Sequence, residues 1–81
     1  MGEYVVGKLD YIRENDRYGL AIGGVFVKHG FHNGEPLEVL VDGEWTQSCL
    51  DWDFEEGEWR LIGTPFHGNL FGTKARIRRE Y

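Results

Sequence analysis

Three histidines and one cysteine are the side chains best suited to metal binding or nucleophilic chemistry. His29 and His32 share one Gly-containing loop, His67 lies in the other long loop, and Cys49 falls between them in sequence. Imidazole and thiolate are common zinc ligands, and a Cys–His pair can form an activated nucleophile. Their spacing matches no recognised zinc pattern, and Cys49 is predicted to face the interior as a small buried thiol. The sequence therefore predicts no metal site, no cofactor and no enzymatic activity.

An acidic stretch with interleaved aromatic residues is the strongest candidate for a binding surface. Asp51 and Asp53 would project from one side of a strand, and such a pair of carboxylates could bind a cation or serve glycoside hydrolysis. A barrel this small fills its interior with side chains and offers no cleft, so a solvated outer face is the simpler interpretation. Exposed aromatic area beside charge also suits protein–protein contact, including a decoy or inhibitor that occupies a basic, nucleic-acid-binding site. The candidate protein-binding residues are Asp51, Trp52, Asp53, Phe54, Glu55 and Glu56.

Basic residues concentrate near the C-terminus. Small barrels bind single-stranded nucleic acid or nucleotides where aromatic rings lie beside Lys or Arg, and Tyr4, Tyr11 or Tyr18 could supply such rings. The net charge of −5 opposes this function, and a charged edge strand that blocks sheet extension is the simpler interpretation. The candidate nucleic-acid-binding or nucleotide-binding residues are Lys74, Arg76, Arg78 and Tyr18.

Length and composition predict one small domain covering residues 1–81. A single cysteine excludes an internal disulfide and favours a reducing, cytoplasmic location, and no apolar run is long enough to cross a membrane. Five Phe, four Tyr and three Trp are expected to form much of the core. The three tryptophans, Trp45, Trp52 and Trp59, are predicted to be mainly structural, with at least two largely buried.

Turn signals separate short apolar runs throughout the chain and predict β-hairpins. A Gly-Gly loop at residues 23–24 would place Ile22 opposite Val25 and Leu20 opposite Val27, with all four side chains on one face. The last strand, residues 74–79, would alternate basic residues outward with Ala75 and Ile77 inward.

The Asp-Gly turn at residues 42–43 allows two registers. A three-residue bulged loop places Val39 opposite Trp45 and gives the cleaner separation of apolar from polar residues, so it is the predicted register. That choice requires a second bulge or bend near Cys49 and Leu50 to return later apolar residues to the interior. A four-residue loop, residues 55–58, would then align Trp52 with Leu61 and Phe54 with Trp59.

Together these elements predict an all-β fold of about six short strands without a substantial helix. The strands would form a small SH3-like or OB-like barrel, or a strongly bent meander.

Several segments resemble a family of short Firmicutes proteins known only as a domain of unknown function, common in clostridial genomes and mobile elements. The resemblance rests on residues 17–20, 34–39, 41–45 and 57–64. It implies a small accessory protein, phage- or plasmid-borne, and no activity or site residues. The family often has a cysteine before the Leu37-Glu38-Val39 strand, which this chain lacks. The predicted function is a non-enzymatic module that binds an unknown protein, with single-stranded nucleic acid or a nucleotide as the alternative ligand.

Overall fold

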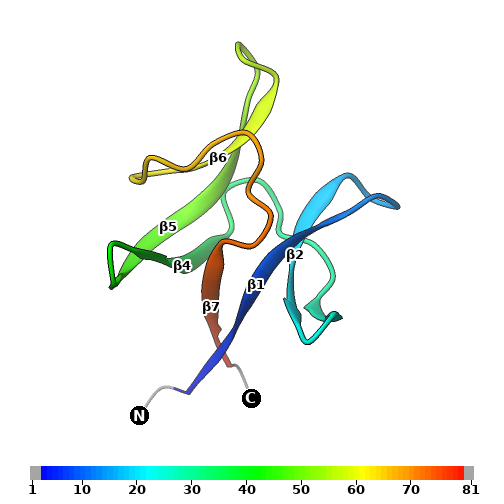
Figure 1. Cartoon of the computed structure of the whole chain (residues 1–81). Coiled ribbons are helices and arrows are strands. Elements are labelled where there is room, and N and C mark those ends of the chain that lie inside the picture. Colours follow the sequence, from blue (N-terminus) through cyan, green and yellow to red (C-terminus); the bar gives the residue numbers. More distant parts are fainter. Residues whose placement is uncertain (1–2, 80–81) are drawn as a thin grey trace.

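A computed structural model describes residues 3–79, which form seven antiparallel strands and no helix (Figure 1). The strands are β1 (Tyr4–Ile12), β2 (Arg17–Ile22), β3 (Val25–Lys28), β4 (Pro36–Val41), β5 (Glu44–Asp53), β6 (Glu58–Leu61) and β7 (Lys74–Arg78). They pair in the order β3-β2-β1-β7-β4-β5-β6 and curl into a half-barrel. This confirms the all-β, barrel-like prediction, with seven strands in place of about six. The choice between SH3-like and OB-like topology stays a prediction.

The last strand, β7, lies in the middle of the sheet and joins its two halves (Figure 1). It pairs with β1 from Tyr4↔Arg78 to Lys8↔Lys74 and with β4 at Val39↔Ala75. The predicted alternation is confirmed, because Ala75 is fully buried and the basic residues point outward. The interpretation of this strand as a charged sheet edge is wrong.

The β2–β3 hairpin contains the predicted two-glycine turn. Gly23 and Gly24 both have positive φ, as a tight turn matched to the strand twist requires. Ile22 pairs with Val25, as predicted.

Beyond that pair, the predicted hairpin register is wrong. A bulge between Leu20 and Ala21 places Leu20 opposite Lys28 and not opposite Val27. Leu20 is fully buried, whereas Val27 is 47% exposed. Only Leu20 of the four predicted apolar side chains is buried, and the turn end of the hairpin extends away from the core. The four side chains therefore do not form one buried face.

The β4–β5 register also differs from the predicted one. Asp42 and Gly43 both have positive φ and form a two-residue turn, so Val39 lies opposite Thr46 and not opposite Trp45. The physical reason is Ser48, which is buried because its hydroxyl donates to the carbonyl oxygen of Ile62 at 2.8 Å. A satisfied hydroxyl can occupy the interior at little cost.

This register removes the need for a bulge near residue 50. Ser48 and Leu50 both face inward, and Cys49 lies on the outer face, half-buried, so its predicted inward position is wrong. Further along, Leu50 pairs with Leu61, and Trp52 pairs with Trp59. The predicted Trp52–Leu61 and Phe54–Trp59 alignments are therefore wrong.

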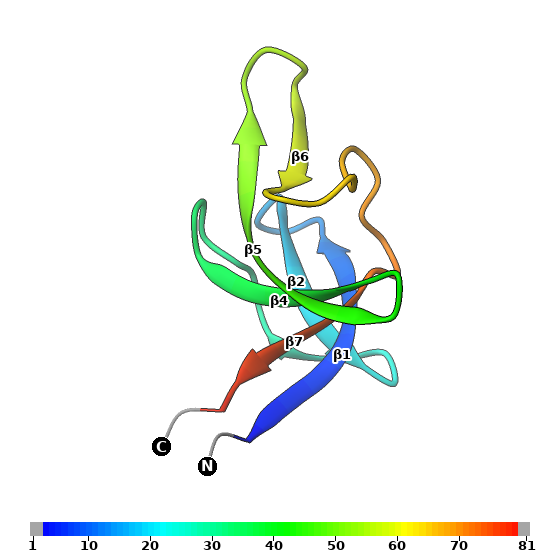
Figure 2. The ribbon, with the colours of Figure 1, turned by 90° about the vertical axis from the view of Figure 1, so that its left-hand side faces the viewer.

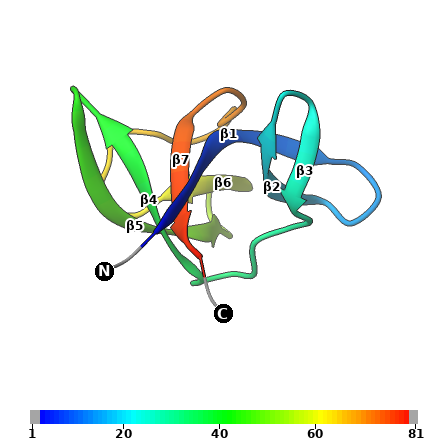
Figure 3. The same cartoon turned by 90° about the horizontal axis from the view of Figure 1, so that it is seen from below.

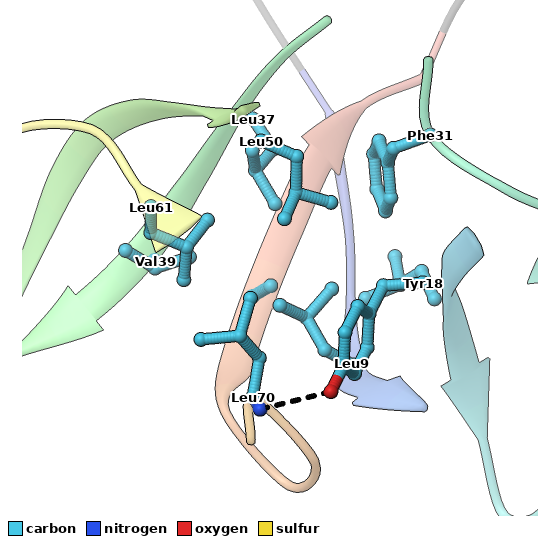
Figure 4. Close-up of a cluster of buried hydrophobic side chains, with 10 residues drawn as sticks. Leu9, Tyr18, Phe31, Leu37, Val39, Leu50, Leu61 and Leu70 are labelled. Carbon is cyan, nitrogen blue, oxygen red and sulfur yellow. Dashed lines mark hydrogen bonds between the residues drawn. The ribbon is translucent and has the colours of Figure 1, made fainter. Parts of the chain in front are cut away.

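Leucine dominates the core (Figure 4). Phe31 and Tyr18 are the two aromatic residues within it, and all three tryptophans are half-buried. The expectation that aromatic side chains form much of the core is therefore wrong. The buried cluster comprises Leu9, Tyr18, Leu20, Phe31, Leu37, Val39, Leu50, Leu61, Leu70 and Ala75.

Tyr18 ties the long loop before β7 to the core. The backbone N–H of Leu70 donates to the Tyr18 hydroxyl oxygen at 3.0 Å (Figure 4). Because Tyr18→Phe leaves this buried N–H without a partner, it should lower the free energy of unfolding by about 1–3 kcal/mol in urea denaturation. Tyr11→Phe is the matched control, since the Tyr11 hydroxyl is exposed where it donates to Asp16. Equal losses in both variants would contradict a structural role for the Tyr18 hydroxyl.

Candidate protein-binding hairpin

The end of β5 and most of β6 form a two-stranded hairpin that projects beyond the rest of the sheet (Figures 1 and 2). We call residues 51–60 the acidic hairpin and residues 54–57 its tip. Its ladder runs from Asp51↔Arg60 to Asp53↔Glu58. At its base, the backbone N–H of Trp52 donates to Asn33 Oδ1 at 3.0 Å, which connects it to the β3–β4 loop.

Asp53 orders the tip. Its Oδ1 accepts hydrogen bonds from the backbone N–H of Glu55 at 3.0 Å and of Glu56 at 3.2 Å. Its carbonyl oxygen accepts a third, from the N–H of Gly57 at 2.7 Å. A carboxylate that satisfies successive turn N–H groups fixes the conformation of the loop, so the tip is held in one shape.

Arg60 and a tryptophan pair brace the two strands. Arg60 Nε donates to Asp51 Oδ2 at 2.9 Å, and one of its terminal nitrogens lies 3.7 Å from Asp53 Oδ2. The hydrogen bond to Asp51, with the nearby acidic charges, raises the pKa of the Arg60 guanidinium. Trp52 and Trp59 meet edge to face with centroids 5.3 Å apart, a favourable aromatic arrangement.

The six predicted protein-binding residues therefore divide into two groups. Asp51, Trp52 and Asp53 hold the hairpin together and are half-buried. Phe54, Glu55 and Glu56 are exposed at the tip, and the Phe54 side chain is 86% exposed, the highest value among the large apolar residues of 3–79. The sequence predicted a hairpin in this stretch, but its loop comprises residues 54–57 and not 55–58. The bracing role of Asp53 depends on the conformation of that loop.

The predicted basic site is partly assembled. Arg76 Cζ lies 3.8 Å from the Tyr4 ring centroid and 4.4 Å from that of Trp45, so the guanidinium contacts both rings. Its Nη2 also lies 2.8 Å from Glu38 Oε1. Arg78 Cζ lies 5.8 Å from the Tyr4 ring centroid, and its hydrogen bond to Tyr4 raises the pKa of its guanidinium.

Tyr18 does not belong to that basic site. Its ring is buried in the core, so it is wrong as a nucleic-acid-binding candidate. Trp45 takes part and was missed, because the predicted β4–β5 register turned it inward. Counting Ser48 as an inward residue would have placed Trp45 on the outer face.

The remaining candidates stay apart. His67 Nδ1 contacts Glu58 Oε2 at 2.7 Å, whereas His29 lies beside Phe26 with ring centroids 6.1 Å apart. Within residues 3–79, no group of three or more His, Cys, Asp or Glu side chains could hold a metal ion. The same residues contain no helix long and apolar enough to span a membrane.

The seven-stranded antiparallel sheet and its projecting hairpin define a small all-β domain. The chain belongs to a family described as a domain of unknown function, DUF5348, which matches residues 7–77. Comparisons with curated proteins and with solved structures found no match.

Proposed function

We propose that this domain is a non-enzymatic binding module that docks the tip of its acidic hairpin onto a basic partner protein. The observation that carries the proposal is the 86% exposure of Phe54 on a tip whose conformation Asp53 fixes. Covering a large exposed apolar side chain with a partner surface makes the binding free energy more favourable. Because the tip is already ordered, binding costs little conformational entropy.

The chemistry of the tip specifies the partner. Phe54 suits an apolar pocket, and the adjacent Glu55 and Glu56 suit a rim of Lys and Arg. Surfaces of that kind occur on nucleic-acid-binding proteins, where the hairpin would act as a decoy or inhibitor. The resemblance to short proteins of mobile elements supports an accessory role of the phage or plasmid type.

The basic outer face supports a second candidate, binding of single-stranded nucleic acid or a nucleotide. Arg78 is exposed beside Tyr4, which is the juxtaposition that such ligands use. Arg76 is less available, because Glu38 and two aromatic rings already engage its guanidinium. The hairpin is therefore the better-supported site.

Two double variants with equal and opposite charge changes distinguish these functions. We expect Glu55→Gln/Glu56→Gln to slow association with a partner captured from the native host at least several-fold, because the tip charges steer the encounter. Lys74→Gln/Arg78→Gln changes the same number of exposed charges and should leave protein binding intact. All four residues are exposed, so both variants should fold.

The salt dependence of binding gives an independent readout. Under the nucleic-acid alternative, losing two phosphate contacts would flatten the slope of log affinity against log salt by roughly two. If Lys74→Gln/Arg78→Gln loses binding and Glu55→Gln/Glu56→Gln keeps it, the hairpin proposal is wrong.

A further inference from the structure

A groove with mostly apolar walls lies along β1, in the half of the sheet away from the acidic hairpin. Its volume is about 490 Å³, within the range of small-molecule sites. Strand β1 lies between β2 and β7 (Figure 3), and the turn between β2 and β3 and the loop before β7 complete the walls. The hairpin is formed by β5 and β6 at the other end of the strand order, so the groove is separate from the proposed docking site.

The apolar walls of the groove are exposed, although the backbone that carries them is ordered. Val6 is 40% exposed, Ile22 is 45% exposed and Phe71 is 67% exposed. The N–H of Gly72 donates to the carbonyl oxygen of Leu9 at 2.9 Å, so the loop that carries Phe71 is held against β1. A ligand that covers these walls removes apolar area from water and needs to order little of the chain.

Two lysines of the groove have no acidic partner. Lys8 and Lys74 are direct neighbours in the β1–β7 ladder, and both are exposed. Within residues 3–79, neither side chain forms an ion pair or a hydrogen bond. Like charges directly opposite each other on neighbouring strands are destabilising. An anion that contacts both ammonium groups would therefore relieve this repulsion.

We propose that the groove binds a small amphiphilic monocarboxylate of the fatty-acid type. Its carboxylate would contact the two lysines, and its aliphatic chain would lie along the apolar walls. Among the described residues that line the groove, Asp10 is the acidic one, and its Oδ1 accepts the N–H of Tyr11 at 2.9 Å. Two lysines and one aspartate give the groove a net charge of +1, which matches a ligand with one negative charge.

The charge of the whole chain favours a free molecule over a membrane surface as the source of this ligand. A net charge of −5 opposes adsorption to a bilayer that contains anionic lipids. The volume of the groove also suits one short-chain molecule and not an extended surface.

A chemical-shift titration of the ¹⁵N-labelled protein with octanoate tests the ligand class. We expect saturable changes at the amides of residues 6–10, 21–24 and 71–74, which line or flank the groove. Because each buried methylene strengthens binding by up to about fourfold, octanoate should bind at least about tenfold more tightly than butanoate. Octanol has the same chain length without the charge and should bind at least about threefold more weakly than octanoate. Changes without saturation, or equal affinities for octanoate and either comparison ligand, would overturn the proposal.

A double variant tests the position of the carboxylate. Lys8→Gln/Lys74→Gln removes two exposed, unpaired charges, so it should fold, and its affinity for octanoate should fall at least about threefold. Its affinity for octanol should match that of the wild type. Arg13→Gln/Arg79→Gln is the matched control, because it removes two exposed positive charges outside the groove and should bind octanoate normally. Equal weakening in both double variants would show general attraction to positive charge and would contradict a site at the two lysines.

Discussion

Phe31→Ala should leave the domain largely unfolded at 37 °C. Phe31 has no exposed surface, although it lies in the loop between β3 and β4. Its N–H donates to the carbonyl oxygen of Tyr18 at 2.8 Å, and its own carbonyl oxygen accepts from Arg17 at 3.2 Å. These hydrogen bonds tie the loop backbone to β2. The loop therefore cannot move inward to fill the cavity that the Phe31→Ala substitution would leave.

The expected size of the effect follows from the size of the domain. Truncating a buried Phe to Ala costs about 3–5 kcal/mol, and a chain of this length has roughly 4–12 kcal/mol of stability in total. Urea denaturation followed by circular dichroism measures the loss. Phe71→Ala is the matched control, since Phe71 is mostly exposed and its truncation should cost less than about 0.5 kcal/mol. If the urea midpoint of Phe31→Ala lies close to the wild-type value, packing of Phe31 does not contribute substantially to the stability of the core.

Local signals in the sequence predicted the hairpins but not every register. Gly-Gly and Asp-Gly turns depend on adjacent residues, so they could be located directly. The β4–β5 register depended on Ser48, whose burial is permitted by a hydrogen bond to Ile62, fourteen residues away. Binary patterning counts a serine as outward and cannot include a partner that only the folded chain supplies.

The sequence also did not show which segments that are distant along the chain lie side by side in the fold. Alternation showed which face of β7 is buried, but not that the strand lies between β1 and β4. Phe31 does lie in a loop, but its complete burial could not be predicted, because loops give no periodic signal. For the acidic hairpin, composition identified the residues, whereas the division into bracing and exposed groups depended on the hydrogen bonds of Asp53.

Phe54→Ala should have the largest effect on partner binding of any surface substitution in the hairpin. Anchor residues at the centre of an interface typically contribute at least about 2 kcal/mol, which corresponds to a roughly 30-fold weaker affinity. Because truncation removes short-range contact area and no charge, the loss should appear as faster dissociation, with the association rate nearly unchanged. Glu55→Gln/Glu56→Gln should show the opposite kinetic pattern, since charges act mainly on the encounter.

Surface plasmon resonance with the captured partner separates the two rate constants. The melting temperature of Phe54→Ala should match that of the wild type, because the side chain is 86% exposed and contributes little to the core. Phe71→Ala removes a similarly exposed ring from another loop and should bind normally, which separates a specific anchor from general surface hydrophobicity. If Phe54→Ala and Phe71→Ala dissociate at the wild-type rate, the hairpin tip is not the docking site. A loss in both variants would indicate that the partner recognises exposed apolar surface without selecting the hairpin.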